Sequence, residues 1–157
     1  VAADIVTGEA YIPERGHLAD IVRASMAVPA VFAPKEIGDR LLVDGGIVNN
    51  VPVSVVRAMG ATRVIAVDVG SPLQSREELR TPASIAYQML SVLMKERTDR
   101  ELATLEAGDV LITPALGAFS SSDFPSAATV IPIGADAARA AEPALAAFAA
   151  PAEQWQA

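Results

Sequence analysis

Short apolar runs along the chain alternate with longer stretches in which apolar residues recur every three or four positions. The runs at residues 1–6, 41–43, 64–69 and 110–113 are rich in Val, Ile, Leu or Ala and predict β-strands. The run at 64–69 is apolar except for one acidic residue, which is typical of a strand covered on both faces in a parallel sheet.

Helical spacing of apolar residues predicts helices at 18–26, 53–59 and 136–148, and a longer helix that begins at Thr81-Pro82. Thr81 is expected to cap this helix, with Pro82 at the first helical position, where a missing N–H is harmless. Because strands and helices alternate, we expect an α/β fold with a mainly parallel, doubly wound sheet. A half-domain is as consistent with the number of elements as a whole domain.

One acidic residue ends the second of these strands. Asp44 follows the run at 41–43 and precedes the chain's only adjacent glycines, Gly45 and Gly46, which predict a turn. Open α/β sheets bind ligands at the carboxyl ends of their strands, and glycines let a backbone or a substrate approach closely. An Asp-Gly pair is also an ordinary structural turn, so the surrounding sequence has to decide between the two interpretations.

Composition narrows the function classes. The 157 residues carry a net charge of −7 and no cysteine, which argues against a basic nucleic-acid surface and excludes disulfides and thiolate metal sites. His17 is the single histidine, so a histidine metal site cannot form, and it is interpreted as a polar residue at a helix entry. No apolar run reaches the length of a membrane span. We expect no metal, no cofactor and no nucleic acid, and the sequence leaves the compartment open.

Familiar catalytic and phosphate-binding motifs do not occur in these residues. No two glycines are four positions apart, so a Gly-x-Ser-x-Gly nucleophile elbow is missing, and so are the dinucleotide fingerprint and the P-loop. Ser25 lacks flanking glycines and is interpreted as a small packing residue. A nucleotide-binding domain is therefore disfavoured.

Several segments, in order and with matching spacing, resemble the patatin-like phospholipases. Residues 23–34 look like the segment before the family's Asp-Gly-Gly motif, and residues 42–52 resemble the motif itself. Residues 59–69 resemble the helix end and strand that follow, and 3–9 the strand upstream. Later residues resemble bacterial members less specifically, so the resemblance is strong over about positions 3 to 70.

This resemblance implies a lipid acyl-ester hydrolase of phospholipase A or lysophospholipase type that uses a Ser-Asp dyad. Asp44 would be the base, Gly45 and Gly46 would let the serine elbow and substrate approach, and Phe32 would line an acyl pocket. The other interpretation of Phe32 is plain core. A carboxylate in water is a weak base for a hydroxyl, so the role requires a partly desolvated site.

The family's serine elbow and oxyanion loop lie upstream of the strand that opens this chain. We therefore expect residues 1–150 to be the C-terminal part of a bacterial-type patatin-like catalytic domain, with 151–157 as a tail or linker. The fold would be a partial three-layer α/β/α sandwich whose N-terminal half is either supplied elsewhere or lost. The expected partners are that missing half and the lipid substrate. The chain alone would be inactive. The alternative is a non-catalytic fragment or a homo-oligomerisation module.

Smaller features complete the expectations. Asn49 and Asn50 are expected to bond the backbone of the turn after Asp44. Residues 120–124 are interpreted as a surface loop. The protein is expected to be cytoplasmic or exported, with no transmembrane segment in this chain.

Overall fold

A computed structural model describes residues 1–29, 31–117, 119 and 124–149. The chain divides into two compact units. Unit 1 comprises Val1–Pro52 and Leu73–Ala103, and unit 2 comprises Val53–Pro72 and Thr104–Ala157. The predicted tail at 151–157 and most of the predicted loop at 120–124 lie outside the described residues.

Unit 1 contains a four-stranded sheet in the order β2-β1-β4-β3. Its strands are β1 (Ala2–Asp4), β2 (Ala10–Tyr11), β3 (Lys35–Ile37) and β4 (Arg40–Asp44). Each pairing in this sheet is antiparallel, so the expectation of a mainly parallel sheet is wrong here.

The antiparallel arrangement has a local cause. β3 and β4 are joined by only two residues, Gly38 and Asp39, and so short a connection can join only antiparallel strands. Gly38 has a φ of +64°, which a residue with a side chain rarely adopts. The hairpin was overlooked because β3 carries Lys35 and Glu36 and lacks an apolar run.

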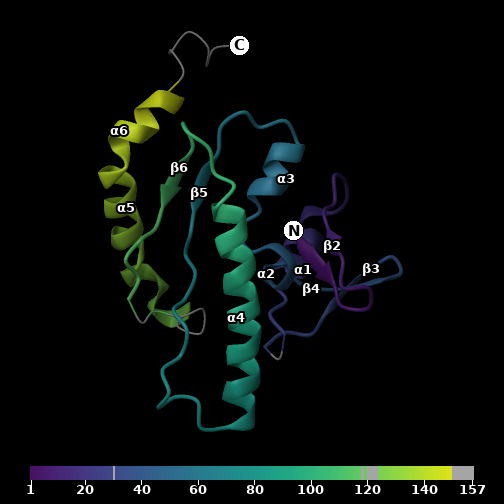
Figure 1. The fold of residues 1–157 in the computed structure, drawn as a ribbon. Helices are drawn as coiled ribbons and strands as arrows, with labels where there is room; N and C mark the ends of the chain where they lie inside the picture. The colour runs from purple at the N-terminus through teal and green to yellow at the C-terminus, as the bar shows by residue number, and fades with distance from the viewer. Residues whose placement is uncertain (30, 118, 120–123, 150–157) are drawn as a thin grey trace. The chain divides into compact units, whose positions relative to one another are not determined.

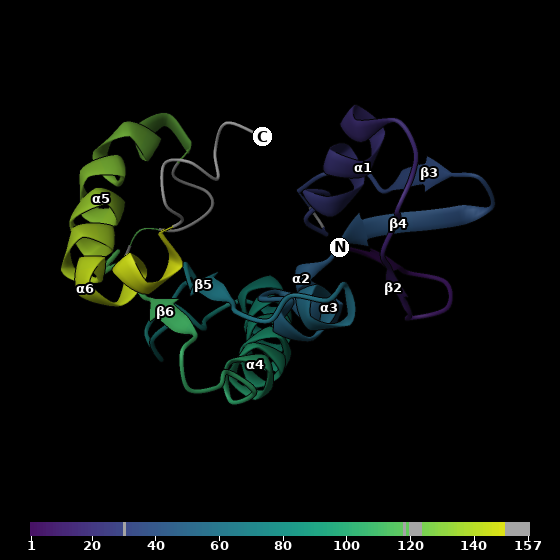
Figure 2. The same cartoon turned by 90° about the horizontal axis from the view of Figure 1, so that it is seen from above.

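Two helices of unit 1 were predicted. α1 (Leu18–Ser25) packs against one face of the sheet, where Ala24 lies fully buried with Ala2 and Leu42 (Figure 2). α4 (Pro82–Leu102) begins where the sequence predicted, at a capping box between Thr81 and Ser84. A short helix, α2 (Gly46–Asn49), lies beside α4 (Figure 1).

Unit 2 contains the parallel pair of the fold. β5 (Ile65–Val67) pairs with β6 (Val110–Ile112) in parallel, and α3 (Val53–Ala58) precedes them. Both strands were predicted, and the structure is of the α/β class. The prediction that β5 is buried on both faces is wrong. Ala66 is buried on one face, but Val67 on the other face is 49% exposed.

The C-terminal part of unit 2 is helical. A 3₁₀ segment (Phe124–Thr129) leads into α5 (Ile131–Ala140), α6 (Glu142–Leu145) and a final 3₁₀ turn (Ala146–Phe148). The predicted single helix at 136–148 therefore begins earlier and is interrupted. Pro143 lacks the N–H that would continue the hydrogen-bond ladder of α5, so a new helix starts there.

Candidate active site

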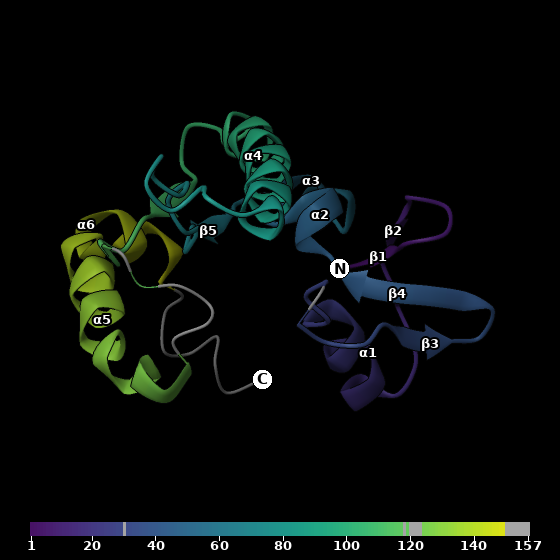
Figure 3. The same cartoon turned by 90° about the horizontal axis from the view of Figure 1, so that it is seen from below.

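Asp44 is the last residue of β4, and the chain turns directly from it into α2 (Figure 3). Its backbone N–H donates to the carbonyl of Ala27 at 3.0 Å, which ties the strand end to the segment after α1. Its side-chain Oδ1 accepts from the backbone N–H of Gly46 at 2.7 Å. The residue is half-buried. The carboxylate is therefore held in one orientation at the tip of a strand, as the sequence placed it.

The two glycines after Asp44 are enclosed by atoms of unit 1. A Cβ on Gly45 would overlap the carbonyl oxygen of Val1 at the start of β1. A Cβ on Gly46 would lie 2.6 Å from Cε of Met94 and 3.0 Å from Oδ1 of Asn50. The close approach predicted for these glycines is thus made by the chain's own backbone and side chains. That they also admit a serine or a substrate stays a prediction.

Ser25 lies at the end of α1, and its hydroxyl donates to the carbonyl of Val1 at 2.7 Å. That carbonyl is the same one that fills the space beside Gly45. Ser25 therefore fixes the backbone next to the Asp44 turn, which agrees with its predicted packing role.

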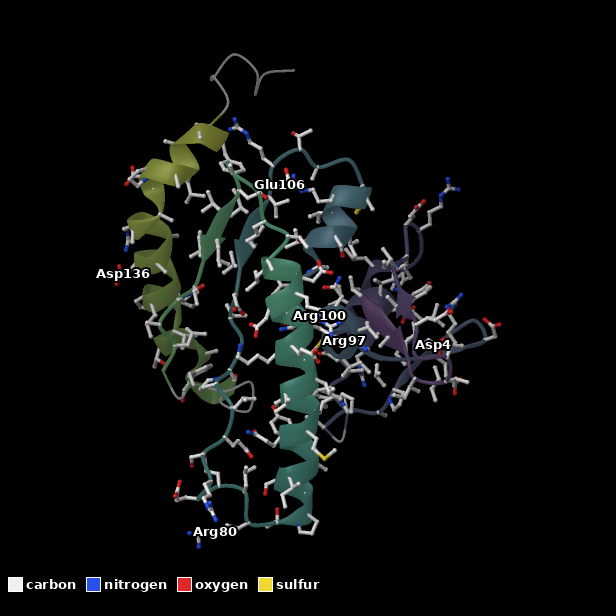
Figure 4. The ribbon with its side chains drawn as sticks, viewed as in Figure 1. Asp4, Arg80, Arg97, Arg100, Glu106 and Asp136 are labelled. Atoms are coloured by element: carbon white, nitrogen blue, oxygen red, sulfur yellow. The ribbon has the colours of Figure 1, made fainter. Side chains whose placement is uncertain are left out.

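α4 anchors the short helix that follows Asp44. Nδ2 of Asn49 donates to Oε1 of Glu101 at 3.1 Å, and Nη1 of Arg97 donates to the carbonyl of Val48 at 3.1 Å. Figure 4 shows Arg97 on α4, at the level of α2. The sequence predicted that the Asn49 side chain bonds the backbone of the turn after Asp44. In the structure, its amide nitrogen donates to a side chain on α4.

Sequence reasoning missed both contributions of α4. Residues 95–101 carry many charges and were interpreted as a solvated stretch. Arg97 and Glu101 are four positions apart, so they lie on neighbouring turns of one side of the helix. This spacing shows that the two side chains share one side of the helix, but it does not show which element that side contacts.

Phe32 is 37% exposed, so it is not part of the buried core. The guanidinium of Arg23 lies 5.4 Å from the centre of its ring, and Nη2 of the same arginine donates to the carbonyl of Ala33 at 3.0 Å. Phe32 thus forms a cation–π pair at the surface, and its contribution to an acyl pocket stays a prediction.

His17 lies where the sequence placed it, at the start of α1, and its Nδ1 is 3.3 Å from Oδ2 of Asp20. The ammonium group of Lys35, which bonds Oδ1 of Asp20 at 2.6 Å, lowers the pKa of that carboxyl. Within the described ranges, no three His, Asp or Glu side chains are grouped as a metal site would require. In the same ranges no helix is both long and apolar enough to cross a membrane.

Comparison with known proteins finds a family model that matches the part of the chain that contains Asp44. The family model described as patatin-like phospholipase matches residues 4–57. An uncharacterized NTE family protein of Mycobacterium tuberculosis is 44% identical over 69 residues, which is 44% of this chain and 12% of that protein. A second such protein of that organism is 41% identical over 69 residues, 44% of this chain and 19% of its own length.

A mammalian protein shows similarity of the same level. Patatin-like phospholipase domain-containing protein 6 of Mus musculus is 41% identical over 85 residues, 52% of this chain and 6% of the mouse protein. The chain thus matches only a small part of each of these relatives. The matched family segment contains Asp44, both of its glycines, Ser25 and Phe32. Residues 4–57 therefore match the patatin-like phospholipase family model, and the similarity to these relatives covers about half of the chain.

Proposed function

We propose that this chain supplies the aspartate of a Ser-Asp dyad in a lipid acyl-ester hydrolase of the phospholipase A or lysophospholipase type. The observation that carries the proposal is the orientation of Asp44. Gly46 holds Oδ1 by its N–H, while Oδ2 has no hydrogen-bond or ion-pair partner among the described residues. A serine hydroxyl supplied by the missing polypeptide would donate the hydrogen bond that Oδ2 can accept.

The chemistry follows from that hydrogen bond. The serine oxygen attacks the ester carbonyl while Asp44 accepts the proton of the serine hydroxyl. This attack forms a tetrahedral oxyanion. When the intermediate collapses, the carbon–oxygen bond to the alcohol breaks, and Asp44 returns its proton to the leaving oxygen. Water then hydrolyses the acyl-serine by the same steps. Half-burial of Asp44 favours this role, since fewer waters compete for its oxygens.

The serine and the oxyanion donors are proposed to come from polypeptide outside these 157 residues, because no Gly-x-Ser-x-Gly occurs in them. A lone carboxylate cannot perform acyl transfer, so the chain by itself is inactive. The finer architecture belongs to the same proposal: both sheets would be parts of one three-layer α/β/α sandwich that the N-terminal half completes. Substrate contact by Gly45, Gly46 and Phe32 is also part of it.

A reconstitution experiment tests this function. The chain is co-expressed with a polypeptide that carries the serine elbow and oxyanion loop of a patatin-like phospholipase, and p-nitrophenyl butyrate hydrolysis is measured. We expect Asp44→Asn to lower the rate by at least roughly a thousandfold. Asp39→Asn, at the exposed tip of the β3–β4 hairpin, is the matched control and retains the rate. Activity that survives Asp44→Asn contradicts the proposal.

The alternative is a non-catalytic fragment or oligomerisation module, and the missing serine elbow is what favours it. The complex would then form without hydrolysing any ester. Sedimentation velocity of the chain alone and of the co-expressed pair distinguishes these cases. Association without activity in a pair whose serine half is known to be competent would support the alternative.

A further inference from the structure

Unit 2 contains a hollow between its parallel strand pair and α5. Its volume is about 430 Å³, which lies within the range of ordinary small-molecule pockets. Residues of the strands and of the loops that follow them line one side of the hollow, and residues of the helical segment line the other. The lining residues include Val67, Val69, Ile112, Pro114, Gly134 and Ala138.

The composition of α5 explains why the space is not filled. Gly134 and Ala138 are four positions apart, so both lie on the helix side that lines the hollow. A Cβ on Gly134 would meet nothing within 4 Å. Asp136, in contrast, points away from the strands (Figure 4). The helix thus presents its smallest side chains where a core helix would present Leu or Ile.

The strand side of the hollow is apolar and incompletely covered. Val67 and Ile112 are register partners in the parallel pair, so their side chains share one face of it. Ile112 is buried, whereas Val67 is 49% and Val69 60% exposed. Apolar strand residues under a helix are normally buried, so the exposure of these valines marks space that an apolar group would occupy favourably.

The lining also defines the chemistry of the occupant. Among the described residues that line the hollow, only Ser71 has a polar side chain, and none has a charged one. Water that contacts such a lining finds few polar partners, so an apolar group would displace it favourably. Ser71 is exposed and follows the carboxyl end of β5, where α/β sheets bind ligands. A linear apolar chain whose polar end lies near Ser71 fits this distribution.

We propose that the hollow binds a single hydrocarbon chain of a lipid, either ester-linked or as a free fatty acid. The hollow shares no residue with the site around Asp44, Gly45, Gly46 and Phe32, so its proposed role does not depend on the proposed hydrolase function. Because no described residue of the lining is a cation, an uncharged ester is expected to bind more tightly than a carboxylate with the same chain.

Binding is tested with the full 157-residue chain and cis-parinaric acid, whose fluorescence rises in an apolar environment. Gly134→Leu and Ala138→Leu each fill the hollow and are expected to weaken probe binding at least tenfold. Ala140→Leu, on the exposed part of the same helix, is the matched control and leaves binding unchanged. Circular dichroism and thermal unfolding show whether each variant is folded. If Gly134→Leu does not fold, the binding of the probe to Ala138→Leu decides the outcome.

Displacement of the probe distinguishes the two sources of the chain. Stronger displacement by methyl laurate than by lauric acid identifies ester-linked chains, and the reverse order identifies free fatty acids. Either order supports the site if the filling variants lose binding. Absence of probe binding to the wild-type chain overturns the proposal. So does equal binding by Ala138→Leu and Ala140→Leu.

Discussion

The carbonyl oxygen of Val1 lies where a side chain at Gly45 would begin. The start of β1 therefore packs directly against the turn that follows Asp44, and Ser25 holds the same carbonyl by its hydroxyl. Gly45 has an ordinary φ of −70°, so this position does not need the conformational freedom of glycine. Glycine is required here because a side chain would prevent the close approach. The position of the candidate catalytic carboxylate thus depends on backbone-to-backbone contact.

Gly45→Ala is expected to destabilise the protein by about 1–3 kcal/mol, because its Cβ meets backbone atoms that cannot move independently. Gly46→Ala is expected to cost less, because the nearest atom is the flexible Met94 Cε and alanine favours the helix. Urea unfolding of the two variants measures the difference. Equal losses of unfolding free energy would contradict this explanation of the two glycines.

The Asn49–Glu101 hydrogen bond joins α2 to α4 across 52 positions. Asn49→Asp places a second carboxylate beside Glu101, and the repulsion should cost about 1 kcal/mol or more at neutral pH. Lowering the pH protonates one carboxyl and should restore part of the loss. Asn50→Asp, at an exposed position next in the chain, is the control in the same urea titration. The double variant Asn49→Asp/Glu101→Gln should recover the stability lost in the single variant.

Local signals were sufficient for much of this structure. Thr81-Pro82 fixed the start of α4, and the apolar run at 64–69 contains β5. In both cases the determining interactions lie within a few residues. Asp44 was placed at a strand end for the same reason, because a polar residue and two glycines end an apolar run.

Elements without an apolar pattern, and contacts between residues far apart in the sequence, were not predictable in the same way. β3 has charged residues and little apolar pattern, so its antiparallel pairing with β4 was missed. Glu101 is a charged residue on a charged helix, and only the packing of α2 reveals its partner. The hollow beside α5 arises from side chains that are too small, which a sequence shows only as an alanine-rich helix.

The cap of α4 provides a further test. Oγ1 of Thr81 accepts from the N–H of Ser84 at 3.0 Å, and Oγ of Ser84 accepts from the N–H of Thr81 at 3.1 Å. Thr81→Ala removes the first of these bonds and should lower the unfolding free energy by about 1 kcal/mol. Thr81→Ser keeps the hydroxyl and should retain most of the stability. Thermal unfolding followed by circular dichroism compares the two, and identical midpoints would show that the cap contributes nothing.

Asp109 makes the stability of unit 2 depend on pH. The backbone N–H of Glu106 donates to its Oδ2 at 2.8 Å and that of Val64 to its Oδ1 at 2.8 Å, and Arg57 forms an ion pair with it. These bonds, with Glu106 first, lower the pKa of the Asp109 carboxyl below its ordinary value. The ionised form is therefore favoured in the folded protein.

The sign of the effect follows from that direction. Because the folded pKa is lower than the unfolded one, the carboxylate stabilises the protein fully above the unfolded pKa of about 4. The contribution is lost as the pH falls through the folded value. Asp109→Asn should therefore lower the melting temperature at pH 7, and the difference from wild type should shrink below about pH 4. Asp136→Asn, in an exposed pair with Arg139, should change little at any pH. A difference between wild type and Asp109→Asn that stays constant down to acid pH would show that the hydrogen bonds of Asp109 do not depend on its charge.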